Sequence, residues 1–86
     1  MNINELITIV KNKLEIEIDI QDIKIEDKSF LHKKHKGHQE GKYHLKLTIK
    51  SHELNKNNKI ISTKKIYSII KPELKEYIHS IQILFT

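Results

Sequence analysis

The six histidines are the side chains with the widest chemistry in this sequence, because it contains no cysteine. Three of them recur at every third position, as His32, His35 and His38, and His44 follows close behind. Neutral imidazole is a ligand for zinc, copper, nickel and iron, so this spacing suits a metal clamp. The spacing alone nevertheless favours a solvated, partly protonated basic loop, because a flexible segment does not preorganise its ligands.

Motifs that mark the common enzyme classes are missing from the sequence. It has no HExxH pair, no P-loop, no GxGxxG fingerprint and no nucleophile elbow around a serine. Gly37 and Gly41 do not stand between a strand and a helix, as a phosphate-binding loop requires. Asp22, Glu26 and Asp27 are most simply the solvated face and end of a strand. We therefore expect that the protein has no catalytic residues and is not an enzyme.

Length and composition indicate one small soluble domain over residues 1–86. A chain of 86 residues that is 37% hydrophobic can bury a single modest core. No apolar stretch approaches the ~20 residues of a membrane span, and Glu5 interrupts the apolar positions behind the first methionine. Without cysteine, the chain alone builds no disulfide scaffold and no thiolate metal site. A cytoplasmic protein is the simplest expectation.

Positive charge begins abruptly after Asp27. Residues 1–27 hold three lysines against seven acidic residues, residues 28–46 hold six lysines against Glu40 alone, and the formal net charge is +5. A basic chain attracts nucleic acid. All sixteen basic residues are lysines, however, and arginine is the better reader of guanine. The excess of lysine, isoleucine and asparagine is also what A+T-rich codons produce, so both explanations stay open.

Apolar spacing predicts a helix at the start of the chain. Asn2 and Glu5 form a capping-box pattern that would begin it. Residues 14–20 then alternate apolar and acidic side chains, which on its own indicates a strand. The apolar positions that follow helical spacing are Ile3, Leu6, Ile7, Val10 and Leu14.

Two strands and a loop are expected next. The alternation changes phase before residue 22, so a turn or bulge should precede a strand over residues 22–28. Residues 29–42 lack apolar periodicity and contain both glycines, which predicts a long mobile loop. Residues 43–50 alternate apolar and polar side chains, as a half-buried strand does.

The last third of the sequence predicts two helices and a strand. A polar connection over residues 52–59 leads to a short helix over residues 61–70, for which Ser62 is the expected cap. A second helix, Pro72 to Tyr77, can begin at the proline. Residues 79–85 then alternate as a strand, with Ile81, Ile83 and Phe85 on one face. The order αββααβ indicates an α+β fold.

Several short segments carry a resemblance to a known family. They begin with Ile-Glu-Asp-Lys-Ser (25–29), a histidine-bearing loop and Tyr-His-Leu-Lys-Leu (43–47). Lys-Lys-Ile-Tyr-Ser (64–68) and Glu-Leu-Lys-Glu-Tyr-Ile-His-Ser-Ile (73–81) follow. In this order they resemble the strands and short helices of the BolA family over about residues 3–85. Ile78-His79-Ser80 occupies the place of that family's hydrophobic-His-Ala signature.

Three features depart from the family pattern. Its Arg-His-Arg motif reads Ser62-Thr63-Lys64 here, and a glycine of the preceding connection falls at Lys56. The loop is longer than in some relatives, so either His32 or His35 aligns with the family's loop histidine. The resemblance also implies that the first helix ends at about Leu14.

The resemblance implies both a fold and a function. The fold would be class II KH-like, with two layers and helices on one face of a three-stranded mixed sheet. The chain would be the partner of a monothiol glutaredoxin, sharing a [2Fe–2S] cluster with it and with glutathione, in cluster trafficking or iron regulation. No cluster would stay tightly bound to the isolated chain, which would be a monomer or weak homodimer that does not bind membranes.

The same resemblance assigns roles to individual histidines. His79, at the start of the last strand, would be the fixed cluster ligand, and His32 or His35 the movable one. His44, beside the loop, is expected to orient neighbouring groups or to pack within its strand.

Two other functions compete with this one. A KH-like transcriptional regulator would bind nucleic acid through the helix pair, with Lys64 and Lys65 as contacts, although no GxxG loop joins the helices. An independent histidine-only metal buffer would bind metal without any partner.

Overall fold

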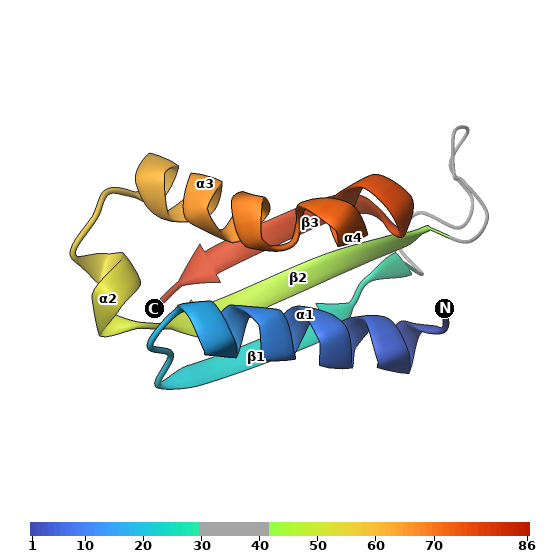
Figure 1. The fold of residues 1–86 in the computed structure, drawn as a ribbon, viewed down its shortest axis with the longest axis horizontal. Coiled ribbons are helices and arrows are strands. Elements are labelled where there is room, and N and C mark those ends of the chain that lie inside the picture. Colours follow the sequence, from blue (N-terminus) through green and yellow to red (C-terminus); the bar gives the residue numbers. More distant parts are fainter. Residues whose placement is uncertain (30–41) are drawn as a thin grey trace.

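The computed structural model describes residues 1–29 and 42–86. The loop predicted over residues 29–42, with its histidines, lies almost entirely outside these residues. Figure 1 shows the element order, which confirms the predicted αββααβ arrangement and adds one short helix, α2. The elements are α1 (Ile3–Glu17), β1 (Asp22–Asp27), β2 (Tyr43–Lys50), α2 (His52–Asn55), α3 (Lys59–Ile69), α4 (Lys71–Glu76) and β3 (Ile78–Phe85).

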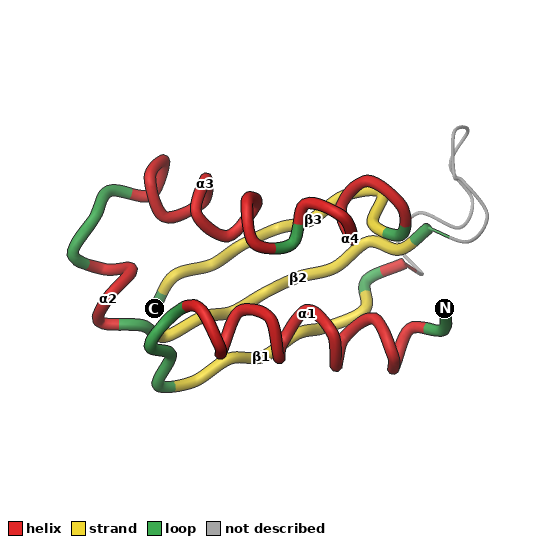
Figure 2. Tube along the Cα trace, viewed as in Figure 1, coloured by secondary structure: helices red, strands yellow, loops and turns green. Residues whose placement is uncertain are grey.

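The three strands form one mixed sheet in the order β1-β2-β3. Strand β2 is antiparallel to β1 and parallel to β3. The parallel pair requires a crossover connection, which α2, α3 and α4 provide. Figure 2 shows the helices lying over one face of the sheet. The predicted α+β fold, with helices on one face of a three-stranded mixed sheet, is confirmed.

The core lies between this face and the helices. Alternate residues of β2 point into it, and β1 and β3 place isoleucines and Phe85 beside them. Burial of these apolar side chains provides the main stabilisation of the fold. The buried apolar residues are Leu6, Val10, Leu14, Ile18, Leu45, Leu47, Ile49, Leu54, Ile66, Ile70 and Ile78.

The start of α1 confirms the predicted capping box. The Glu5 backbone N–H donates to Asn2 Oδ1 at 2.8 Å, and Asn2 Nδ2 donates to Glu5 Oε1 at 3.1 Å. The first bond satisfies a backbone N–H that a helix start otherwise leaves to water, and the second joins the two side chains.

The end of α1 corrects the strand expected over residues 14–20. The helix runs to Glu17, so it includes the first four residues of the expected strand. It also extends past Leu14, where the resemblance implied that it ends. Leu14 and Ile18 are buried four residues apart, as on one helix face, whereas Ile16 is 79% exposed. The residues that pack against the core have helical spacing here, so the apolar–acidic alternation over residues 14–20 does not form a strand.

Helix α3 begins earlier than predicted and has another cap. Asn58 is the N-cap, and its Oδ1 accepts from the Ile61 backbone N–H at 2.9 Å. Ser62, the predicted cap, is buried inside the helix and donates through Oγ to the Leu54 carbonyl at 2.7 Å. The prediction failed because Ile60 and Ile61 in the first turn are exposed, so the apolar residues here do not mark the buried side of the helix.

Helix α4 lies within one residue of its predicted position, but its buried side includes a charge. Leu74 and Tyr77 are half-buried, whereas Glu73 is buried. Lys13 Nζ, from α1, contacts Glu73 Oε2 at 2.7 Å. The other oxygen, Oε1, is buried and has no hydrogen-bond partner among the described residues. This ion pair joins α1 to α4.

Candidate functional site

His79 stands at an irregularity where β3 begins. Tyr43 pairs with Ile78, whereas the next residue of β2, His44, pairs with Ser80. The register therefore skips His79, which is the extra residue of a β-bulge. Tyr43 also donates its backbone N–H to the Tyr77 carbonyl at 2.9 Å, so both sides of the bulge are fixed to β2.

The His79 side chain is exposed, while its neighbour Ile78 is buried in the core. Across residues 1–29 and 42–86, no hydrogen bond or ion pair engages the His79 ring. An exposed imidazole on a fixed backbone is a ligand available to a group presented from outside the chain.

His44 lies beside His79 on the central strand and is engaged within the fold. Its Nδ1 is hydrogen-bonded to Ser80 Oγ, and its backbone N–H donates to Ser29 Oγ at 3.1 Å. Its carbonyl accepts from the Lys28 N–H at 2.8 Å. The ring is half-buried. These contacts attach the start of β3 to the end of β1.

Ser29 closes the same end of the sheet from the β1 side. It is buried, and both its backbone N–H and its hydroxyl contact Asp27 Oδ1. The chain leaves the described residues after Ser29 and returns at Lys42, next to β2. His32, His35 and His38 lie outside the described residues. Both ends of the segment that carries them are at the sheet end where His79 lies.

The described residues contain one exposed histidine at this end rather than a complete metal site. No group of three or more histidine and acidic side chains within residues 1–29 and 42–86 is arranged to hold a metal ion. A metal or cluster bound here would need further ligands beyond the described part of the chain.

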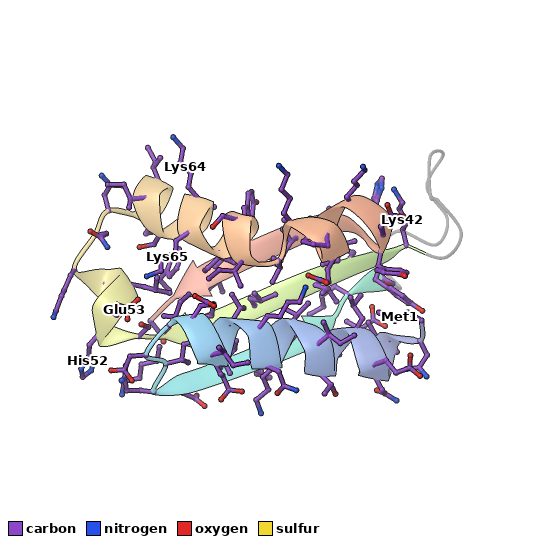
Figure 3. All side chains as sticks on the ribbon, viewed as in Figure 1. Met1, Lys42, His52, Glu53, Lys64 and Lys65 are labelled. Atoms are coloured by element: carbon purple, nitrogen blue, oxygen red, sulfur yellow. The ribbon has the colours of Figure 1, made fainter. Side chains whose placement is uncertain are left out.

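Lys64 and Lys65, the predicted nucleic-acid contacts, both lie on the exposed side of α3. Lys65 is engaged in an ion pair, with its Nζ 2.7 Å from Glu53 Oε2. Lys64 borders a shallow, mainly apolar hollow with Ile60 and Tyr67. In Figure 3, Lys64 is far from Lys42, which marks the end of the sheet where β3 begins. The structure therefore does not bring these lysines together with His79.

Most polar side chains of the sheet lie on the face opposite the helices. This face is called the open face below. Strand pairing puts Glu26 opposite Lys46 on this face. Lys24 Nζ lies 2.7 Å from Glu26 Oε1, and Lys28 Nζ lies 3.2 Å from Oε2. The hydrogen bonds from Lys24 and then Lys28 lower the pKa of Glu26 to about 2.

A carboxyl titration followed by NMR tests this electrostatic arrangement. Because its folded-state pKa is lowered, the stabilisation by ionised Glu26 is present above its ordinary pKa of 4.5 and is lost as the pH falls towards about 2. Replacing Lys24 and Lys28 with alanine should return the pKa towards 4.5. Lys50→Ala, at the far end of the same face, should leave the titration unchanged. An unshifted midpoint in the double variant would contradict the assignment.

Ser29 and Ser80 were not identified from the sequence as parts of this site. Ser80 becomes significant only when the register places it opposite His44, and Ser29 only when its hydroxyl meets the same residue from the other side. The one available signal in the sequence was that Ser80 stands where the family has alanine.

Comparison with known proteins decides the family of the chain. A family model described as BolA-like protein matches residues 14–86. The chain belongs to the BolA-like family. Among solved structures, the BolA domain of SufE1 from Arabidopsis thaliana is 28% identical, with a TM-score of 0.76 over 92% of this chain and 87% of that one. No match was found among curated protein sequences.

Two further BolA-like structures support the fold. BolA1 from Arabidopsis thaliana superposes with a TM-score of 0.77 at 24% identity, over 92% of this chain and 87% of that one. A bol-like protein from Babesia bovis gives 0.70 at 18% identity, over 91% and 79%. The BolA-like, class II KH-like fold implied by the sequence is thus confirmed. None of the described helices is long and apolar enough to cross a membrane.

Proposed function

We propose that this BolA-like chain is the partner of a monothiol glutaredoxin and contributes histidine ligands to a [2Fe–2S] cluster held between them. Glutaredoxin and glutathione would supply the thiolates, which accounts for a role in iron–sulfur chemistry without cysteine in this chain. The chain would act by binding, not by catalysis, in cytoplasmic cluster trafficking or iron regulation.

The position of His79 carries this proposal. Its exposed ring lies on a bulge whose neighbours, Ile78 and Ser80, are fixed by burial and by contact with His44. A ligand held in this way costs little conformational entropy when a partner brings the cluster. Imidazole is a suitable donor to iron. Relative to thiolate ligation, it raises the reduction potential of a [2Fe–2S] centre and adds a protonatable ligand.

A second ligand would come from the segment between Ser29 and Lys42. His32 follows Ser29 by three residues and His35 by six, so fully extended chain would reach about 11 Å and about 21 Å from Ser29. Ser29 contacts His44, which pairs beside His79. Chain length therefore permits either histidine to approach the same cluster, and both remain candidates.

Mixing the chain with cluster-loaded monothiol glutaredoxin tests the proposal. The isolated chain should be colourless, and its addition should change the visible absorption and circular dichroism of the cluster until one chain is bound per glutaredoxin. Co-purification of the two proteins should give the same spectrum. A cluster spectrum unchanged at saturating concentration, together with no co-purification, would refute the partnership.

Nucleic-acid binding is distinguished from this function by its salt dependence. A regulator that contacts phosphates through Lys64 and neighbouring lysines should lose affinity log-linearly as salt rises. Because Lys65 is already paired with Glu53, we expect only weak binding to DNA without sequence preference. Tight, sequence-selective binding in fluorescence anisotropy would favour the alternative.

A further inference from the structure

The outer edge of β3 presents backbone groups at three successive alternate residues that pair with no other strand among residues 1–29 and 42–86. The Thr86 N–H donates to the Ile49 carbonyl at 2.9 Å, which fixes the direction of the backbone at this end of the strand. Because backbone direction alternates along a strand, the N–H and C=O groups of Ile81, Ile83 and Phe85 point away from β2. No other described strand lies beyond them.

The two edges of the sheet differ sharply in charge. Strand β1 contains four charged residues among its six, whereas the eight residues of β3 include no lysine, aspartate or glutamate. Proteins commonly protect exposed edges with charges, proline or bulges. The only such feature of β3 is the bulge at His79, at its beginning. Within the described part of the chain, nothing else protects this edge against pairing.

Apolar side chains accompany these backbone groups. Ile81, Ile83 and Phe85 are only half-buried on the helix side of the sheet, and Leu84 is 40% exposed on the open face. Figure 1 shows α3 and β3 along one long side of the molecule and α1 and β1 along the other. Of the six exposed large apolar residues in the described part, Ile60, Ile61, Tyr67 and Leu84 belong to α3 and β3.

We infer that β3 pairs antiparallel with β3 of a second copy of this chain, forming a two-fold dimer with a continuous six-stranded sheet. With the axis at Ile83, each Ile83 exchanges N–H···O bonds with Ile83 of the second copy, and Ile81 does so with Phe85 of that copy. This register keeps both helical layers on the same face, because directly opposed residues of antiparallel strands point to the same side. It also extends each core with the other copy's half-buried residues.

A second copy is the favoured occupant because the edge is self-complementary. An uncharged strand meets itself without like-charge repulsion, whereas β1 would bring Asp22, Lys24, Glu26 and Asp27 into such a pairing. In the proposed register, Ser80 faces Thr86 of the second copy, so His79 lies just outside the paired segment. The dimer would therefore leave this histidine accessible, and the inference does not depend on the proposed function.

Analytical ultracentrifugation of the full chain between about 10 µM and 1 mM provides the test. A small interface of this kind belongs to the weak class, so the weight-average mass should rise with concentration from monomer towards dimer. Backbone amide exchange measured over the same range should slow at Ile81, Ile83 and Phe85. It should not change at Ile23 and Ile25, whose N–H groups form the outer edge of β1 by the alternation that starts from Lys28.

Paired charge variants test the register without touching the core. Gln82 and Leu84 are both exposed on the open face, and each would face the other across the axis. Gln82→Lys combined with Leu84→Lys should weaken the dimer about tenfold, and Gln82→Lys combined with Leu84→Glu should restore it by cross-strand ion pairs. Thr48→Lys, on the same face of the central strand, should leave the dissociation constant within about twofold.

Three outcomes would overturn the inference. The first is a chain that stays monomeric at 1 mM. The second is a dimer that responds equally to both double variants, because its interface would then lie elsewhere. The third is protection of the β3 amides only when glutaredoxin is added, since the partner would then occupy this edge. Far-ultraviolet circular dichroism of each variant confirms that the comparison is made between folded chains.

Discussion

His79→Ala is expected to abolish the change that this chain causes in the visible spectrum of a glutaredoxin-bound cluster, reducing its amplitude at least about tenfold. The substitution removes the one exposed imidazole that the described residues place at the start of β3. Stability should change by less than about 0.5 kcal/mol, since His79 is exposed and its ring makes no hydrogen bond or ion pair among the described residues. The measurement is a titration of cluster-loaded glutaredoxin, followed by absorption and circular dichroism.

His52→Ala provides the matched control for this experiment. His52 is also exposed, but it begins α2, and Figure 3 shows it at the end of the molecule away from Lys42. This variant should give the wild-type spectrum. If His79→Ala gave that spectrum too, the ligand assignment would be wrong even if the two proteins still bound each other.

The loop histidines are separated by the same titration. His32→Ala and His35→Ala, made singly, should give different spectra. Replacing the true second ligand should change the cluster spectrum, whereas replacing the other histidine should not. If neither variant differs from wild type while His79→Ala does, the chain contributes a single imidazole.

Lys13→Met is expected to destabilise the fold by about 1–3 kcal/mol, which lowers Tm by roughly 4–20 °C in a domain of this size. Glu73 is buried, and its Oε2 has Lys13 Nζ at 2.7 Å while Oε1 has no described partner. Removing the lysine leaves a buried, uncompensated carboxylate. The expected loss is below that of a fully buried pair, since Lys13 is 38% exposed. Thermal and urea unfolding measure it.

The two partners of this ion pair should respond unequally. Glu73→Leu removes the buried charge, and the lysine that remains is free to reach water, so stability should stay within about 1 kcal/mol of wild type or increase. The double variant should then recover most of what Lys13→Met loses. Equal losses in both single variants would show that the pair contributes net stability rather than specificity.

The strands were predictable because each alternates visibly and lies against one core. β1 and β2 were found within one residue of their expected bounds, and Ile81, Ile83 and Phe85 share the face that the pattern assigned to them. The periodicity of a half-buried strand is set by local geometry, so it survives in the sequence.

The end of α1 and the cap of α3 were not predictable in the same way. Residues 14–20 satisfy both a strand and a helix pattern, and only the position of Ile18 against the core decides between them. Asn58 caps α3 before any buried residue of that helix appears. Both features depend on which surface the segment meets rather than on its own periodicity.

The resemblance proposed the residues of the candidate site, but their arrangement could not be predicted from the sequence. The resemblance identified His79, yet the bulge that exposes it arises where β2 meets a strand more than thirty residues later. The contact of Ser80 with His44 depends on the same pairing. Long-range register of this kind has no signature within either segment alone.

Because of the bulge, the side chain at position 79 can also be changed without disturbing the pairing of the sheet. Because the ladder passes directly from Ile78 to Ser80, no cross-strand partner selects the side chain between them. A thiolate, a carboxylate or an amide side chain can therefore replace the imidazole at position 79 as the ligand, while the backbone that presents it stays the same. His79→Cys and His79→Asp would form a graded series on one scaffold, in which ligand chemistry alone varies.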